Sequence, residues 1–466
     1  MCYILLLPPL IGMADNGDFE RVIYPRGIYH LGDTKEEQAL DFFVSRYGIY
    51  QYYNEFRGGI TTTQIPFIQL ALFLNPLFSA DNSVFDIRAL AFIMILYATI
   101  TIYLLVDYVD HGKRDFAGYL AGFLSIYFFV DVGYIAYYNS FFAEGISFIS
   151  FIFAITCGLL LVQRRYNPYL LSGLMFLNAI ILTFAKQQNA PVGILFGILF
   201  FILAFLLTKN RQPAAEKQAV LKNQTLFRFG MIGASGILSV AAVVVYLIIP
   251  ETFININKLH SMTRGAMMVS ENPEKTLGYF TIDRQYALLN NMIYYERYPV
   301  IDVESKLLAD TFYSKYGYPS LVSYYLLHSV DFFRILSIAV ENGYAVRPQS
   351  LGNYEKSAGF SPGAKSYFFA AHSTIKQNIA PRTAGFLLIW LLVVVAVNWK
   401  NPGKLMVLLC AILIGLSQIL VSIIGAGDAD ISKHLFLYNV AFDLINYLLI
   451  TAGLSQILTI FRKKKA

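Results

Sequence analysis

The chain has 466 residues, of which 56% are hydrophobic and only 14% are charged, and its net charge is +6. Soluble proteins of this length usually carry nearer a quarter charged residues, so the composition argues against an ordinary soluble protein and indicates a membrane protein. The basic residues form no stripe of the kind that binds nucleic acid, and we expect no nucleic-acid partner. The three cysteines lie apart in apolar segments and suggest neither a disulfide framework nor a thiolate metal site.

The first apolar segment, Met1–Met13, is shorter than the ~20 residues that a membrane span requires. It lacks the basic residues and the cleavage site of a signal peptide. We interpret it as the end of a first transmembrane helix that enters from the cytoplasm, with residues missing upstream.

Residues 14–85 are expected to form a long first outer loop. Apolar residues at helical spacing predict an amphipathic helix over Lys35–Tyr47. Ile65–Phe78 is apolar but short and contains two prolines, so we expect a re-entrant or interfacial segment there.

Nine longer apolar runs follow in chain order. They are Arg88–Val109, Phe116–Val130, Ile146–Val162, Tyr169–Phe184, Val192–Leu207, Gly230–Ile249, Ala384–Val397, Leu405–Ile424 and Leu435–Ile460. With the N-terminal helix they predict an all-α polytopic membrane protein of about ten transmembrane helices. Loops rich in Lys and Arg recur at every alternate turn, as cytoplasmic loops do, which places residues 14–85 outside.

The stretch 250–382 has no apolar run of 18 residues, so we predict a mainly helical extracytoplasmic region inserted between spans. Short helices over Tyr313–Tyr325 and His328–Val340 are expected to pack on the membrane face. The predicted organisation is a transmembrane catalytic module over residues 1–249, this soluble region, and C-terminal transmembrane helices over residues 383–466.

Five polar clusters fall on the predicted outer side. They are Asp15, Asp18 and Glu20; Tyr137–Glu144; Lys186–Asn189; Lys258–Arg264; and Asp428–His434. A carboxylate at this surface can accept a proton from an acceptor hydroxyl or hold a divalent cation. A nearby Lys or Arg can bind a lipid phosphate. Together these groups suit an enzyme whose leaving group stays in the membrane while its acceptor arrives from water.

The candidate residues divide into three groups. The candidate catalytic acids are Asp18, Asp15 and Glu144; the candidate lipid-phosphate ligands are Lys186, Arg264, Lys433 and His434; the candidate substrate ligands are Asn139, Gln187, Gln188, Asp428 and Asp430. Each has a plainer explanation as well. A carboxylate can cap a helix or face its dipole, an outer lysine can extend its charge toward water, and a histidine can be an ordinary interfacial residue.

Four short motifs stand out: Asn16-Gly17-Asp18-Phe19, Tyr138-Asn139-Ser140-Phe141 with Glu144, Ala185-Lys186-Gln187 and Lys433-His434-Leu435-Phe436. With a short first span and a long outer loop, they resemble the GT-C glycosyltransferases, and most of all the bacterial surface-glycan hexosyltransferases of the S-layer type. There is no Walker A, HExxH or GxSxG motif, which argues against ATP-driven transport and soluble-type hydrolysis.

The resemblance implies a bacterial plasma-membrane enzyme that takes a sugar from a polyprenyl-phosphate donor on the outer side and passes it to a glycan or lipid-linked acceptor, with inversion. It implies Asp18 as the base with Asp15 close by, Glu144 as a second acid, and Lys186 near the lipid phosphate. It leaves open which of Asp15 and Asp18 is the base. It also leaves open whether the acids bind Mg²⁺ or Mn²⁺.

Three other functions stay open. A flippase or transporter of lipid-linked sugars would need ionisable groups inside its spans, whereas here we expect them at span ends. A glycan polymerase or ligase would use arginines of the outer region, and a non-catalytic partner subunit would need no base at Asp18.

Overall fold

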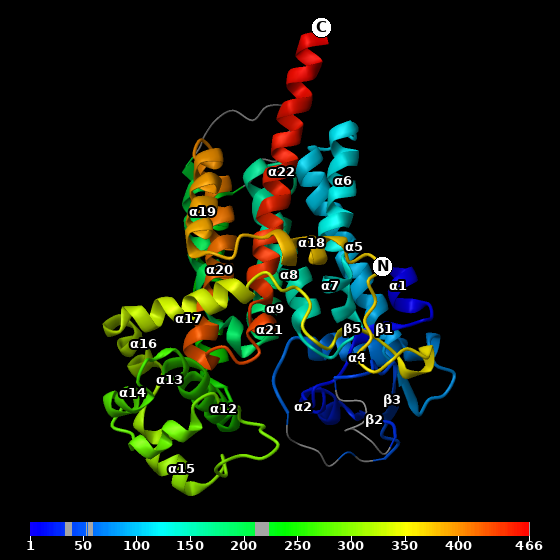
Figure 1. Cartoon of the computed structure of the whole chain (residues 1–466). Helices are drawn as coiled ribbons and strands as arrows, with labels where there is room; N and C mark the ends of the chain where they lie inside the picture. Colours follow the sequence, from blue (N-terminus) through cyan, green and yellow to red (C-terminus); the bar gives the residue numbers. More distant parts are fainter. Residues whose placement is uncertain (33–39, 53, 55–58, 210–222, 466) are drawn as a thin grey trace.

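The computed structural model describes residues 1–32, 40–52, 54, 59–209 and 223–465, and the chain forms a bundle of long helices with smaller elements gathered at one end (Figure 1). Among the described residues, seven helices are long and apolar enough to cross a membrane. They are α5 (Arg88–Asp110), α8 (Glu144–Gln163), α9 (Pro168–Ala185), α10 (Ala190–Lys209), α11 (Gln224–Leu247), α20 (Pro402–Ala426) and α22 (Phe436–Lys465). Even 18 helical residues extend over about 27 Å, which approaches the thickness of the hydrocarbon layer.

Three further pairs of helices are sharply bent and are apolar enough to count as one span each, which makes up to ten spans. The pairs are α6 (Phe116–Phe129) with α7 (Val132–Ile135) and η3 (Ala136–Tyr138), bent by 55°; α16 (Tyr318–Leu327) with α17 (Ser329–Asn342), bent by 108°; and α18 (Ala371–Ile379) with α19 (Ala384–Asn398), bent by 116°. The predicted helical polytopic fold is confirmed. The α16–α17 pair lies where we expected only short surface helices, and residues 132–138 complete a bent helix pair with α6.

Helix α8 is the centre of the bundle, because 94% of its apolar window is buried inside the chain. Its sequence is apolar on every side, as a helix that no lipid or water reaches must be. Helix α11 has only 28% of its window buried and packs mainly on α10. Its outward residues, such as Ile237, Val240 and Val243, are the surface that would face lipid.

Two small antiparallel sheets hold the first loop together at one end of the bundle. Strand β1 (Ile11–Met13) pairs with β5 (Leu351–Tyr354), and strands β2 (Ile28–His30), β3 (Arg46–Ile49) and β4 (Val84–Asp86) form a second sheet. The first loop and most of residues 250–382 lie at this end, opposite the C-terminus of α22 (Figure 1). We call it the loop end.

The prediction of a transmembrane helix ending at Met13 is wrong. Helix α1 covers only Cys2–Leu6, and Pro8 and Pro9 follow it, neither of which can continue a helix. The next residues instead form β1, whose partner β5 lies about 340 residues later in the sequence. A local apolar pattern carries no information about such a distant partner.

The expected amphipathic helix over Lys35–Tyr47 is also not found in the part that the structure describes. Residues 35–39 lie outside the described residues, residues 40–45 are not helical, and Arg46 begins β3. The apolar segment Ile65–Phe78 forms the short helix α4 (Gln64–Leu74) and the turn η2 (Asn75–Leu77), which do not reach span length. This agrees with the expectation that the segment is not a full span, and its re-entrant or interfacial position stays a prediction.

The remaining elements are short and lie mostly at the loop end. They are α2 (Glu20–Ile23), η1 (Tyr24–Arg26), η4 (Gln187–Asn189), α12 (Glu251–Ser261), the π-helical turn η5 (Met262–Ala266), α13 (Met267–Val269), α14 (Pro273–Tyr279), η6 (Arg284–Leu289), α15 (Lys306–Thr311), η7 (Tyr313–Lys315), η8 (Lys356–Ala358) and α21 (Ile431–His434). Helices α12 and α17 contact α20, so this region packs directly on the bundle.

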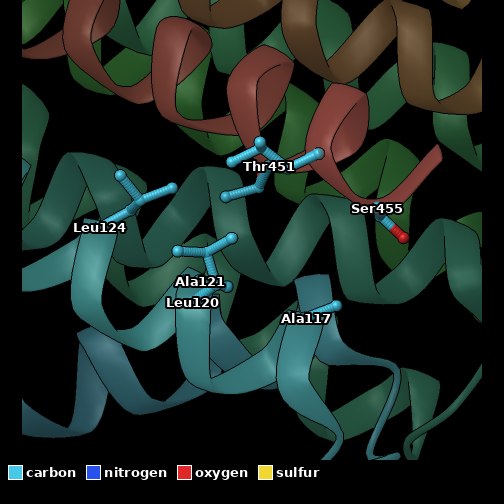
Figure 2. Close-up of a pocket in the computed structure, with 7 residues that line it drawn as sticks. Ala117, Leu120, Ala121, Leu124, Thr451 and Ser455 are labelled. Atoms are coloured by element: carbon cyan, nitrogen blue, oxygen red, sulfur yellow. The ribbon is translucent and has the colours of Figure 1, made fainter. Parts of the chain in front are cut away.

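A small cavity lies between α6 and α22 and is lined mainly by apolar side chains and small residues such as Ala117 and Ala121 (Figure 2). The Thr451 hydroxyl on its wall donates a hydrogen bond of 2.8 Å to the Tyr447 carbonyl of its own helix. Small residues allow two helices to approach closely in a membrane. We interpret this cavity as a packing feature of the helix pair.

Candidate active site

The acidic turn after β1 is shaped by Asp15. Its Oδ1 accepts hydrogen bonds from the backbone N–H groups of Gly17 (2.8 Å) and Phe19 (3.2 Å), and its Oδ2 lies 3.1 Å from Nε2 of His30. Gly17 has φ +94°, a left-handed conformation that glycine adopts without strain. Asp15 therefore fixes the turn, and both its carboxylate oxygens are engaged there.

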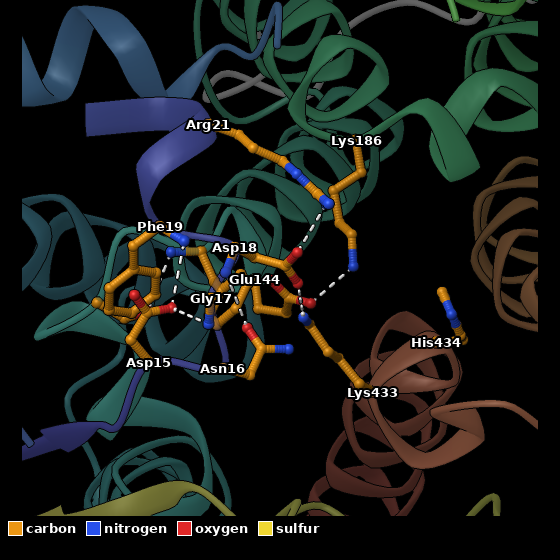
Figure 3. A network of polar contacts seen from close by, with 12 residues as sticks. Asp15, Asn16, Gly17, Asp18, Phe19, Arg21, Glu144, Lys186, Lys433 and His434 are labelled. Atoms are coloured by element: carbon orange, nitrogen blue, oxygen red, sulfur yellow. Dashed lines mark hydrogen bonds and ion pairs between the residues drawn. The ribbon is translucent and has the colours of Figure 1, made fainter. Parts of the chain in front are cut away.

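Asp18, by contrast, directs its carboxylate at two cations (Figure 3). Its Oδ1 lies 2.7 Å from Nη1 of Arg21, and its Oδ2 lies 3.4 Å from Nζ of Lys433. The side chain keeps 32% of its surface exposed, so small molecules can reach it. The next residue, Phe19, is buried against the rings of Phe141 and Phe142 and holds the turn on the bundle.

Glu144 and Lys186 form a second ion pair, 2.6 Å long, which Figure 3 draws together with the contacts of Asp18. Glu144 opens the central helix α8 and is only 1% exposed, while Lys186 is the extended residue between α9 and η4. The second carboxylate oxygen of Glu144, Oε2, is buried and has no hydrogen-bond partner among the described residues. A buried carboxylate with one free oxygen is ready to accept a hydrogen bond from a ligand.

Glu144, Lys186 and Lys433 line a polar cavity with about 200 Å³ of empty space, part of which opens to solvent. Its lining is Glu144, Ser147, Lys186, Gln188, Asn189, Gln418, Lys433, His434, Phe436 and Leu437. The residues come from α8, the Lys186 link between α9 and η4, η4 itself, α20, α21 and α22, so helices far apart in sequence build one site. The lining thus brings together three of the five predicted polar clusters, and Asp18 of a fourth cluster joins them through Lys433.

His434 acts here as a neutral group. Burial, and then the positive charges of Lys186 and Lys433, lower the pKa of His434 from 6.5 to about 3. Its Nδ1 lies 2.8 Å from Oε1 of Gln188, whose amide nitrogen donates to Gln418 and to the His434 carbonyl. His434 can therefore hydrogen-bond a ligand but supplies no positive charge at neutral pH.

Arg264 and Asp428 form a third ion pair nearby. The guanidinium of Arg264 binds both carboxylate oxygens of Asp428, at 2.7 and 2.8 Å. Arg264 lies in the π-helical turn η5, and such turns are frequent at functional sites. Because the two charges satisfy each other, this pair ties residues 250–382 to the loop before α21.

The other predicted ligands occupy different environments. Asn139 is fully buried, and its amide nitrogen donates to the carbonyls of Leu5 and Ile11, so it holds the N-terminal segment in place. Gln187 starts η4 and is half-buried. Asp430 is exposed and precedes α21 in a left-handed conformation.

Sequence reasoning missed several residues of the site, Arg21 above all. Its spacing of three from Asp18, which lies just before the short helix α2, was a usable signal, because side chains three residues apart around a helix start lie close together. Ser147 and Gln418 carried no comparable signal. They meet the site only through the packing of α8 and α20.

A separate buried cluster of ionisable groups was also missed. Asp443 of α22 is 1% exposed and lies 2.8 Å from both Nε2 of His372 and Nζ of Lys376, and it accepts a hydrogen bond from the Tyr134 hydroxyl. Asp443 is about 10 Å along α22 from its first residue. The expectation that ionisable residues sit only at span ends is therefore wrong.

The described residues do not suit a divalent metal. Among them, no group of three or more His, Cys, Asp or Glu side chains could hold a metal ion. The acid that would be central to such a site, Asp18, faces Arg21 and Lys433. Two cations at one carboxylate are poor neighbours for Mg²⁺ or Mn²⁺.

No curated protein matches the chain. One matching solved structure is the archaeal oligosaccharyltransferase AglB from Archaeoglobus fulgidus, in complex with an inhibitory peptide and a dolichol-phosphate. The TM-score is 0.38 and the sequence identity 11%; the match covers 97% of this chain and 48% of AglB, so the chain spans about half the length of that protein. A family model, described as the YfdI N-terminal transmembrane domain, matches residues 1–466, and the chain belongs to this family.

Proposed function

We propose that the chain is a membrane glycosyltransferase that moves a sugar from a polyprenyl-phosphate donor to a glycan or lipid-linked acceptor. The observation that carries this proposal is the position of Asp18, an accessible carboxylate beside two cations, one of which, Lys433, lines a polar cavity. The cavity lies at the loop end, where spanning helices give way to the first loop. A lipid-bound donor and a water-borne acceptor can meet only at such a boundary.

The groups present are sufficient for inverting transfer. Asp18 accepts the proton of an acceptor hydroxyl, whose oxygen then forms a bond to the anomeric carbon of the donor sugar. The bond from that carbon to the phosphate oxygen breaks, and polyprenyl phosphate leaves with both electrons. Lys433 stabilises the negative charge that develops on the phosphate, and Lys186, which lines the same cavity, adds a second positive charge.

Asp18 is a better candidate for the base than Asp15 or Glu144. Asp15 is engaged in the turn, and Glu144 is buried on Lys186. We therefore assign Glu144 to the wall of the site, where its free oxygen can receive a sugar hydroxyl. The part of residues 250–382 that lies at the loop end is our candidate for binding the acceptor, and we propose that the loop end faces the outside of a bacterial plasma membrane.

The test is transfer of a labelled hexose from synthetic polyprenyl-phosphate hexose to membrane glycan, in wild type and Asp18→Asn. Removing a general base typically lowers the rate about 10²- to 10⁴-fold. Asp15→Asn is the matched control, with the same change three residues away. Its transfer activity per amount of folded protein is expected to stay close to that of wild type. Equal transfer by wild type and Asp18→Asn would exclude Asp18 as the base.

One observation favours a second candidate, a flippase or transporter of lipid-linked sugars. Asp443 is an ionisable residue buried within a spanning helix, as transport proteins often have. Its charge is, however, already met by Lys376 and His372. Movement of a labelled lipid-linked sugar between leaflets, without transfer to any acceptor, would replace our proposal by this one.

A further inference from the structure

Arg21 connects the candidate base to the region of residues 250–382. One guanidinium nitrogen lies 2.7 Å from Asp18, another donates a 2.8 Å hydrogen bond to the Tyr295 hydroxyl, and the guanidinium carbon lies 4.6 Å from the ring centre of Phe253. Two separate parts of the chain thus fix the plane of one guanidinium. An acid, a hydroxyl and an aromatic ring therefore contact the same planar guanidinium.

Lys433 approaches the same carboxylate from the opposite side (Figure 3). Its ammonium lies 3.6 Å above the ring centre of Phe142, so its direction is also fixed. Two cations share one carboxylate, which leaves a local charge of +1. The neighbouring pair of Glu144 and Lys186 adds no net charge.

We propose that Arg21 and Lys433 together bind the phosphate of the lipid donor, and that Asp18 occupies the place of this phosphate on them when the site is empty. The inference rests on the proposed function. Arginine can bind phosphate through two parallel N–H donors, and lysine supplies a point charge beside it. When the phosphate takes over both cations, the Asp18 carboxylate is released to meet the acceptor hydroxyl.

The charges balance before and after transfer. A sugar linked through one phosphate is a phosphodiester with a single negative charge, which neutralises the +1 of the site. After transfer Asp18 holds the proton, the two cations carry +2, and the leaving phosphate monoester carries about −1.5 to −2 at pH 7. A sugar linked through a diphosphate carries more negative charge than the +1 of the site can neutralise. We therefore infer that the donor is a monophosphate-linked sugar.

The experiment is binding of farnesyl phosphate, a short polyprenyl phosphate, to the full chain in detergent, measured by titration calorimetry. Arg21→Gln is expected to weaken binding about 10- to 100-fold, because a charge-assisted hydrogen bond is lost. Arg21→Lys keeps the positive charge but lacks the two parallel N–H donors of the guanidinium. It should weaken binding less than Arg21→Gln does. Arg46→Gln, an exposed arginine of the same loop, is the matched control and should bind like wild type.

Asp18→Asn is expected to act in the opposite direction, tightening binding about fivefold, since the competing carboxylate is gone. A merely structural role for Arg21 would not make these two variants move binding in opposite directions. Binding by Arg21→Gln within twofold of wild type, in protein that elutes as a single folded species, would overturn the inference. Because this assay needs no transfer, a chain that binds as expected but transfers no sugar would refute the proposed function alone.

Discussion

Single residues set the geometry of the loop end, and Gly427 shows how. Its φ is +59°, and a Cβ built on it would collide with the Arg264 carbonyl oxygen. Gly427→Ala is therefore expected to push η5 away from the loop, break the Arg264–Asp428 pair and lower the free energy of unfolding by more than about 1 kcal/mol. Gly425→Ala is the control, because a Cβ there has no neighbour within 4 Å. Thermal unfolding in detergent compares the two, and an equal melting temperature would contradict this account.

A second prediction at this scale concerns pH. Burial lowers the pKa of His260 from 6.5 to about 4, and its Nε2 accepts a hydrogen bond from the Tyr294 backbone N–H. Between pH 6.5 and 4 the unfolded chain binds the proton more readily, so stability falls as the pH falls. Acidification from pH 7 to pH 5 is expected to lower the free energy of unfolding by about 2 kcal/mol. In thermal unfolding at pH 7 and 5, His260→Gln, which does not titrate, should lose less stability on acidification than wild type.

At the scale of elements, ion pairs hold helix α18 on helix α22. Helix α18 carries His372 and Lys376, and within the described residues the acid at ion-pair distance from both is Asp443 of α22. Removing one partner of a buried ion pair leaves the other charge uncompensated and costs about 3–5 kcal/mol. Asp443→Asn should therefore lower the melting temperature strongly, and adding Lys376→Gln should restore part of the loss.

The control for this prediction is the ion pair of Glu271 with Arg334, which is exposed to solvent. Glu271→Gln is expected to change the melting temperature too little to measure, because exposed ion pairs contribute little. A similar loss in Glu271→Gln and Asp443→Asn would show that burial is not what makes the Asp443 cluster important.

At the scale of the whole molecule, the prediction is the orientation in the membrane. The loop end carries Glu271, while Lys113 lies in the short loop between α5 and α6 at the other end of the bundle. In a cysteine-free variant, Glu271→Cys should react with a membrane-impermeant maleimide added to intact bacterial cells, and Lys113→Cys should react only after the cells are opened. The reverse result would place the candidate site on the cytoplasmic side.

The sequence by itself determined the bundle. A run of about 20 apolar residues in lipid has to satisfy its own backbone hydrogen bonds, so it forms a helix whatever its neighbours are. This is why α5, α8, α9, α10, α11, α20 and α22 were predictable from hydropathy alone. The acidic turn of Asp15 and Asp18 was equally visible, because it depends on neighbouring residues.

Only the tertiary structure decided which charges meet. Asp18 and Lys433 lie 415 residues apart, and nothing local to either one indicates the other. The same holds for the pairing of β1 with β5 and for Asp443 with Lys376. Hydropathy is a property of each segment, whereas a side chain's partner depends on how the segments pack. The structure could therefore separate Asp15, which shapes the turn, from Asp18, which faces the cations, although both are acids of one loop.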